Sequence, residues 1–359
     1  MSRPATTEDV AWLLLDELSG TGTARRAAEQ LAQDIGLPRA RVAEVGLAVT
    51  ELATNVHLHG GGGALLLRSV RAGGSAAVEV VAVDSGPGIA DVGIARRDGH
   101  STAGTLGIGL GMATRLADRL DIASRPGRGT VLVARFEADR QARPTLAAEA
   151  TGPQAAGISR AVSGEQVCGD AYAVRHDGPR ISLMVCDGAG HGSLAAAAAH
   201  LAVQAFTDPA QPVSPPEVAL RRIHRTLTGS CGGAVAIAEL DLAAHRLRFV
   251  GIGDIAGAVV SAHEKHSLVS VDGIVGYREP PIRPFEQLLP AGAVVILHSD
   301  GVSRRWNFDE IDHLVSGTPL VIAATVLRDA GIRDGDACVL VGKANRLRAC
   351  GQGQPTTSP

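Results

Sequence analysis

The sequence has few aromatic residues, no surplus of positive charge, few cysteines and no long apolar run, and each shortage excludes a class of protein. Aromatic residues make up only 3% of the 359 residues, so alanine, valine and leucine must fill the hydrophobic cores. Lysine and arginine (34) are outnumbered by aspartate and glutamate (37), which leaves no basic excess for nucleic acid phosphates. We therefore expect no nucleic acid among the partners.

The five cysteines are an odd number without any C-x-x-C spacing, so neither a disulfide framework nor a zinc ribbon is indicated. The longest apolar stretch, residues 194–206, is interrupted by His200 and is too short to cross a bilayer. The first residues place Glu8 and Asp9 ahead of a short apolar run, unlike a signal peptide. The sequence thus predicts a cytoplasmic protein with no membrane association.

The length predicts about two domains, at roughly 150 residues each. Residues 137–156 lack apolar periodicity and carry two prolines, which is typical of an interdomain linker. Residues 344–359 are predicted to be a disordered tail. We therefore expect one domain over residues 1–136 and a second over residues 157–343.

Hydrophobic periodicity predicts a strand-rich α+β fold in both halves. A long helix begins near Pro38, and its apolar positions form one continuous face: Val42, Val45, Val49, Leu52 and Val56. Other helices are expected at 24–35, 194–206, 216–227 and 318–330, with a further one that includes Leu110, Ala113, Leu116 and Leu120. Strands are expected at 64–70, 76–83, 130–136, 171–175, 181–186, 233–240, 246–251, 293–298 and 337–341.

Two polar residues stand out on the long helix. Glu51 and Asn55 are four residues apart and so project from one face. Asparagine is unfavourable inside a helix because it competes for backbone hydrogen bonds. An acid and an amide at this spacing could hold a hydrated Mg²⁺ and a water, although a solvated helix face would also explain them.

Two glycine-containing segments follow. Asp84 ends an apolar strand and precedes Gly86 and Gly88; such a carboxylate can accept a hydrogen bond from an exocyclic amine while the glycines let a purine ring approach. An ordinary turn would give the same letters. Residues 104–111 contain alternating glycines and lead into a helix, where backbone N–H groups suit a polyphosphate.

The order of these segments, closed by Gly127-Arg128-Gly129-Thr130, resembles the GHKL ATPase superfamily, and residues 1–136 look like its anti-sigma-factor and stressosome-switch serine/threonine kinases of the RsbW/RsbT type. The resemblance implies an α/β sandwich that binds ATP and Mg²⁺. It implies that Asn55 binds Mg²⁺, that Asp84 contacts adenine, and that Glu51 acts as general base or orients the attacking hydroxyl. The remaining residues expected to contact the nucleotide are Gly86, Gly88, Thr130 and the lid glycines Gly107, Gly109 and Gly111.

The second half contains four aspartates, each next to a glycine or an alanine near a predicted strand: Asp170, Asp187, Asp300 and Asp336. Any one of them could be an Asp-Gly turn. Gathered together, they would repel one another unless cations neutralised them, and oxygen ligands suit hard divalent ions. Two such ions can activate a water for in-line attack on phosphorus.

These motifs resemble the PPM serine/threonine phosphatases of the SpoIIE/RsbX branch over residues 161–343, which implies a β-sandwich flanked by helices with two Mn²⁺ or Mg²⁺ ions. By this resemblance Asp170 and Asp187 hold metal, the carbonyl of Gly188 adds a ligand, and Asp300 holds the second ion. Gly335 departs from the family, whose motif has an aspartate there; Asp334 or Asp336 could substitute.

The sequence therefore predicts a bifunctional regulator. It would be an ATP-dependent serine/threonine kinase and a metal-dependent phosphatase acting on STAS-domain antagonist proteins, with a homodimer possible by analogy to related kinases. The alternative is a partner switch that binds ATP and sequesters a sigma-factor regulator, with weak or no phosphatase activity.

Overall fold

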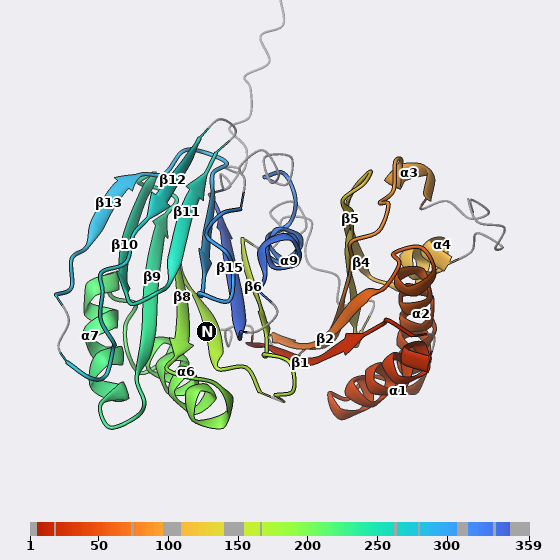
Figure 1. The fold of residues 1–359 in the computed structure, drawn as a ribbon, viewed down its shortest axis with the longest axis horizontal. Coiled ribbons are helices and arrows are strands. Elements are labelled where there is room, and N and C mark those ends of the chain that lie inside the picture. The colour runs from red at the N-terminus through yellow and green to blue at the C-terminus, as the bar shows by residue number, and fades with distance from the viewer. Residues whose placement is uncertain are drawn as a thin grey trace, which may run out of the picture.

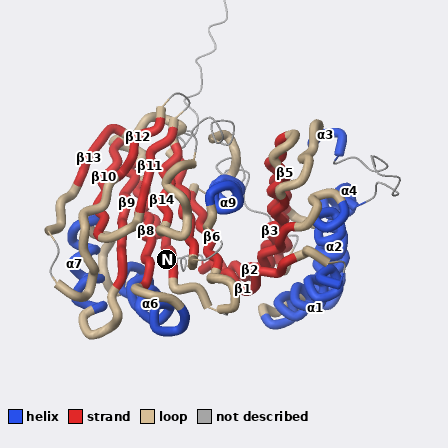
Figure 2. Tube along the Cα trace, viewed as in Figure 1, coloured by secondary structure: helices blue, strands red, loops and turns tan. Residues whose placement is uncertain are grey.

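The computed structural model describes residues 6–17, 19–72, 75–95, 109–139, 154–165, 167–261, 264–278, 281–306, 315–332 and 335–344. Helices and strands are present in both halves, which confirms the α+β class (Figures 1 and 2). The helices are α1 (Ser19–Asp34), α2 (Arg39–Leu58), α3 (Val92–Ala95), α4 (Gly109–Leu116), α6 (Gly192–Thr207), α7 (Pro216–Leu227) and α9 (Pro319–Ala330).

The N-terminal domain is one antiparallel sheet covered by helices on one face. Its strand order is β1-β2-β3-β5-β4, and its strands are β1 (Thr6–Leu14), β2 (Gly63–Ala72), β3 (Ser75–Asp84), β4 (Arg119–Arg125) and β5 (Gly129–Glu137). Helices α1, α2 and α4 pack on this face, and the predicted apolar stripe of α2 is buried there from Val42 to Val56.

The C-terminal domain stacks two antiparallel sheets. One has the order β13-β10-β9-β8-β7 and the other β12-β11-β14-β15-β6. Helices α6 and α7 cover the outer face of the first sheet. The strands are β6 (Ala155–Arg160), β7 (Asp170–Asp177), β8 (Arg180–Gly188), β9 (Gly233–Asp241), β10 (Arg246–Ile252), β11 (Ala256–Val260), β12 (Lys265–Leu268), β13 (Phe285–Leu288), β14 (Val294–His298) and β15 (Ala337–Lys343).

Helix α9 lies between the two domains (Figure 1). One side packs on β6 and β15 of its own domain, and the other packs on the second face of the N-terminal sheet, so residues of both domains share one hydrophobic cluster. Every residue from Pro319 to Leu327 is buried. A helix that is apolar on all sides requires burial on all sides, and here two sheets provide it.

The same interface contains a row of alternating charges. Asp9, Arg68, Glu79 and Arg135 lie directly opposite one another on β1, β2, β3 and β5. Arg68 is 2% exposed; its Nε lies 2.6 Å from Asp9 Oδ1, and its Nη1 lies 3.5 Å from Glu79 Oε2. Burial alone would lower the pKa of Arg68, but the Asp9 and Glu79 carboxylates and the Tyr172 hydroxyl raise it above its ordinary value.

The charge row is bonded across the interface to the C-terminal domain. Arg68 Nη2 donates to the Gly157 carbonyl and the Tyr172 hydroxyl, both at 2.9 Å. Asp9 Oδ2 accepts the Ser159 amide at 2.7 Å, and Trp12 Nε1 donates to the Ser159 carbonyl at 2.6 Å. Polar and apolar contacts thus join the two domains.

The structure differs from the sequence predictions at several boundaries. Leu120 lies on β4, because α4 ends at Leu116. Strand β6 begins at Ala155, inside the predicted linker, and the residues of that linker from 140 to 153 lie outside the described residues, as does the predicted tail beyond residue 344. The strands that the sequence analysis did not predict are β1, β4, β6, β11, β12 and β13. Among the described residues, no helix is long and apolar enough to span a membrane.

Replacing Arg68 by methionine should lower the free energy of unfolding by about 3 kcal/mol, because Asp9 would keep a buried charge without its partner. Urea denaturation measures this. Arg71→Met, at an exposed position near the end of the same strand, is the matched control and should change stability by less than about 0.5 kcal/mol. Equal midpoints for the two variants would contradict the structural role of Arg68.

Candidate active sites

The end of β3 and the end of α2 meet at the first candidate site. Asp84, the last residue of β3, lies opposite Gly63 of β2 and Thr130 of β5. Its Oδ1 accepts the amides of Gly86 at 2.9 Å and Thr130 at 3.1 Å. Burial raises the pKa of Asp84, and these two hydrogen bonds and the charge of Arg328 oppose the rise.

Glycines allow the Asp84 turn to pack against α2. A Cβ on Gly86 would lie 2.7 Å from the Cα of Gly60, and a Cβ on Gly60 would lie 2.5 Å from the Cβ of Asp84. The Asn55 carbonyl accepts the amides of His59 and Gly60, so Asn55 is one turn before this contact. Sequence reasoning missed Gly60, although the glycine run that follows His59 was a signal for it.

A second wall of the turn comes from β4. Gly88 has φ +70°, and a Cβ there would lie 2.0 Å from the Arg125 carbonyl, so only glycine fits. The Ser124 hydroxyl accepts the Ile89 amide at 2.7 Å and lies 2.9 Å from the Thr130 hydroxyl. Asp84, Gly86, Gly88 and Thr130 therefore lie together at this end of the sheet.

The other predicted nucleotide residues lie on helices or outside the described residues. Glu51 is half-buried on α2. Gly109 and Gly111 lie in the first turn of α4, which packs against α2. Gly107 lies outside the described residues.

The second candidate site lies at the ends of β7 and β8, where Asp170 and Asp187 face each other directly. Asp170 is 5% exposed, and its buried Oδ2 has no hydrogen-bond partner. Burial raises the pKa of Asp170, and the charges of Asp336 and Asp300 raise it further. Burial likewise raises the pKa of Asp187, and the charges of Asp170 and Asp300 raise it further.

The loops after β14 and before β15 complete the group. Asp300 is exposed and follows β14 by two residues. A Cβ on Gly301 would lie 1.8 Å from the Asp336 carbonyl, so these loops touch through backbone. Asp336 uses Oδ1 for the Val162 amide at 2.8 Å and Oδ2 for the Gly169 amide at 2.9 Å. Asp336 therefore fixes the segment that leads into Asp170.

Gly188 closes the site against α6. A Cβ on Gly188 would lie 2.2 Å from the Ala195 carbonyl, and Gly190 and Gly192 have positive φ of 95° and 74°, which explains the glycine spacing of this motif. His191 lies on the surface with Nδ1 3.4 Å from Glu165 Oε1.

The donor set of this site suits divalent cations. Burial and the neighbouring carboxylates raise the pKa of both Asp170 and Asp187, and a buried oxygen of Asp170 lacks a partner, a combination that a positive charge would relieve. As the side chains stand in the described residues, no three His, Cys, Asp or Glu groups enclose an ion position. Asp254, in the turn between β10 and β11, pairs with Arg304 at 3.3 Å.

Two polar groups behind the site were not predicted from the sequence. The Ser299 hydroxyl, beside Asp300, accepts the Cys338 amide at 2.9 Å and favours the charged form of Asp170. His298 accepts the indole N–H of Trp306 at 3.3 Å, and burial lowers the pKa of His298 to about 4. Both groups are buried and neutral, and they fix the strand end that carries Asp300.

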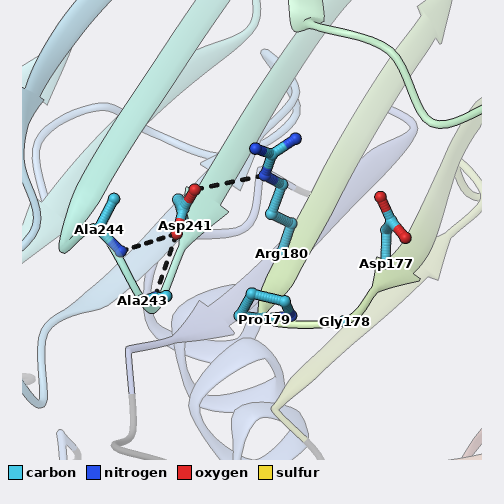
Figure 3. A pocket seen from close by; sticks show the side chains of 7 residues that line it. All are labelled: Asp177, Gly178, Pro179, Arg180, Asp241, Ala243 and Ala244. Atoms are coloured by element: carbon cyan, nitrogen blue, oxygen red, sulfur yellow. Dashed lines mark hydrogen bonds and ion pairs between the residues drawn. The ribbon is translucent and has the colours of Figure 1, made fainter.

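A hollow at the other end of the first sheet is separate from the site of Asp170 and Asp187; its lining is drawn in Figure 3. It is lined by the turns of two hairpins and includes the ion pair between Arg180 and Asp241. Since β8 runs from Arg180 to Gly188, this hollow lies about 25 Å from the Asp187 end at the usual rise per strand residue.

Comparison with known proteins matches both halves. The family model of the histidine kinase-like ATPase domain matches residues 16–136, and that of stage II sporulation protein E (SpoIIE) matches residues 177–327. The serine/threonine-protein kinase RsbT of Bacillus subtilis is 35% identical over 111 residues, which are 31% of this chain and 84% of RsbT.

Two solved structures are also similar. One comes from work on the bacterial stressosome as a modular system adapted to control secondary messenger signaling. It is 27% identical, with a TM-score of 0.48, and the match covers 52% of this chain and 97% of that structure's chain. The other, the PP2C phosphatase domain of SpoIIE from Bacillus subtilis with a fragment of its regulatory domain, has 14% identity and a TM-score of 0.45, over 74% of this chain and 78% of its own.

Replacing Asp187 by asparagine should raise the unfolding free energy of the chelator-treated protein, by an amount on the order of 1 kcal/mol, because one of several repelling buried charges is removed. Thermal denaturation in EDTA measures this. The control is Asp241→Asn on β9. The Asp241 carboxylate accepts the amides of Ala243 and Ala244, so its replacement should not raise the unfolding free energy. An Asp187→Asn protein that melts below wild type would contradict the repulsion.

Proposed function

The chain belongs, through its N-terminal domain, to the family of the serine/threonine-protein kinase RsbT, and we propose on this premise that it is a bifunctional regulator that both phosphorylates serine or threonine on a partner protein and removes such phosphate. The second activity is assigned to the SpoIIE-type domain. The observation that carries it is the group of mutually repelling carboxylates at the ends of β7 and β8.

For the kinase, ATP is the substrate of the Asp84 site. Asp84 keeps its carboxylate oriented through the Gly86 and Thr130 amides, which suits recognition of an exocyclic amine. Asn55 would hold Mg²⁺ on the nucleotide, and Glu51, one turn earlier on α2, would orient or deprotonate the attacking hydroxyl. Gly107, Gly109 and Gly111 would cover the phosphates.

For the phosphatase, Asp170, Asp187, the Gly188 carbonyl and Asp300 would hold divalent cations, Mn²⁺ or Mg²⁺. When bound, such cations neutralise the carboxylates and supply a Lewis acid for attack of water on a phosphoester. Asp336 keeps the Asp170 segment in place through the Gly169 amide, and Gly188 lets α6 approach. Gly190 and His191, in the loop before α6, are exposed.

The partners we propose are STAS-domain antagonist proteins, whose phosphorylation state would decide which regulator they bind. The name of the matched RsbT and the stressosome context of one similar structure support this class. Tethering both activities in one chain raises their effective concentration near a shared partner. The setting would be the cytoplasm, where ATP is available and the four described cysteines stay reduced.

A second candidate function has one specific observation in its favour. Gly335 removes a carboxylate from the late motif, and Asp336 is already bonded through both oxygens to backbone amides. On this alternative the chain binds ATP, sequesters a sigma-factor regulator and has weak or no phosphatase activity.

Incubating the protein with Mg²⁺, Mn²⁺, γ-labelled ATP and a STAS-domain protein should show label gained by the partner and then released. Glu51→Gln should lower the gain by about 100-fold or more, because it removes a general base. Asp187→Asn should abolish release while leaving the gain. Transfer without any release by the wild type would favour the partner switch, and neither transfer nor release would exclude both activities for that partner.

Gly335→Asp should increase metal-dependent hydrolysis of a phosphoester. Among the described residues, a Cβ at Gly335 would meet only the Gly301 Cα, at 3.7 Å, so an added side chain places a carboxylate beside the cluster. We expect at least about a tenfold lower metal concentration for half-maximal rate, the effect of about one charged ligand. Gly335→Asn has nearly the same shape and should give a smaller gain. Identical metal titrations for the wild type and the Asp variant would contradict this.

A further inference from the structure

One arginine of the phosphatase domain reaches the nucleotide site of the other domain. Arg328 lies in the last turn of α9, and its Nη1 donates to the main-chain carbonyl of Asp84 at 3.5 Å. Its side chain is only 8% exposed. The neighbouring Asp329 holds the rest of the guanidinium, with Nε and Nη2 at 2.6 and 3.1 Å from its two carboxylate oxygens.

The position of Asp84 is sensitive to this contact. The Asp84 carboxylate is fixed by the amides of Gly86 in its own turn and Thr130 on β5, whereas its carbonyl accepts a hydrogen bond from Arg328 of α9. The backbone is tightly packed at this point, since a Cβ on Gly129 would lie 2.1 Å from the same carbonyl oxygen. A displacement of Arg328 therefore displaces the peptide that carries the adenine-recognising carboxylate.

The residues directly after Arg328 are bonded to the carboxylate site. The Ala330 carbonyl accepts the Ser303 amide at 2.8 Å, and the Ile332 amide donates to the Gly301 carbonyl at 2.7 Å. Gly331 and Val302 form an isolated antiparallel bridge. Asp300 immediately precedes Gly301, so four residues of chain after Arg328 suffice to reach the loop of a predicted metal ligand.

The helix that carries Arg328 is packed on both sides. Nine consecutive buried residues, Pro319 to Leu327, pack on a sheet on either side, and close-packed interfaces shift between discrete arrangements rather than deform continuously. A change at one end of α9 is therefore transmitted to whatever its last turn contacts, which is Asp84 on one side and the Gly301 loop on the other.

We propose that Arg328 is a positioning residue of the ATP site and that the last turn of α9 couples nucleotide binding to the activity of the carboxylate site. The inference rests on the proposed function, because it needs ATP at Asp84 and phosphoester hydrolysis at Asp187. Coupling between two binding equilibria is reciprocal, so each ligand alters the affinity for the other.

The test uses the full chain and two readouts: the Kd of a non-hydrolysable ATP analogue, by calorimetry, and the kcat and KM for p-nitrophenyl phosphate with Mn²⁺, with and without the analogue. For the wild type, the saturating analogue should change kcat by at least about twofold. Arg328→Ala should weaken analogue binding by about fivefold, the worth of one hydrogen bond, and should abolish the effect of the analogue on kcat.

Arg225→Ala is the matched control, because Arg225 is an exposed arginine in the last turn of α7, on the far side of the phosphatase domain. It should leave both readouts at wild-type values. Arg328→Lys keeps the charge and should recover part of the affinity.

The outcomes separate the inference from its premise. A wild type that binds no analogue refutes the ATP site and the proposed kinase, whereas a wild type that binds it with no change in kcat or KM refutes the coupling. Equal analogue affinity for the wild type and Arg328→Ala refutes the positioning role. Should Arg328→Ala unfold at the assay temperature, the wild-type comparison and Arg328→Lys still decide both points.

Discussion

The buried charge row centred on Arg68 is the constraint on which the architecture depends. A guanidinium that is 2% exposed carries a large desolvation cost, and it is tolerated only where carboxylates and hydrogen-bond acceptors surround it. Asp9 and Glu79 of its own sheet supply the charge, but Gly157 and Tyr172 of the other domain supply acceptors. The N-terminal sheet on its own would expose Arg68 and leave it without the acceptors Gly157 and Tyr172. The row therefore favours one relative placement of the domains, because sliding the sheets by a residue would bury charges without partners.

Burial of the sheet on both faces follows from this placement and explains its composition. Strand β3 has almost no polar alternation: Val78, Val80 and Ala82 face α1 and α2, while Val81 and Val83 face α9. A sheet with one solvated face would alternate apolar and polar residues. Helix α9 has the same property, since it is apolar on every side. The low aromatic content fits these layers, because alanine and valine let a helix and two sheets approach closely.

Sequence reasoning located the elements that carry motifs and missed β1 and β6, which bond to each other across the domain interface. The stripe from Val42 to Val56 and the aspartates at strand ends have clear periodic or positional signals, and the structure places them as predicted. Strand β1 has no such signal, because the hydrogen bonds that Asp9 and Trp12 make to Ser159 reach β6, about 150 residues later. Hydrophobic periodicity indicates which face of an element is buried but not which other element covers that face. The unbroken apolar runs of β3 and α9 were the available signs of a second layer.

Two opposed activities in one chain would only consume ATP if both ran at once on the same partner. A physical connection between the sites is the simplest way for one fold to avoid this, and a shared rigid helix provides it without a moving linker. Each site also contains groups that disfavour folding: Asp84 has a raised pKa through burial, and Asp170 and Asp187 repel each other. Their ligands would relieve part of this strain. Other contacts must offset the stability that is lost at the two sites. The interface that contains Arg68 and α9 provides such contacts from both domains. The same interface therefore stabilises the fold and connects the two sites.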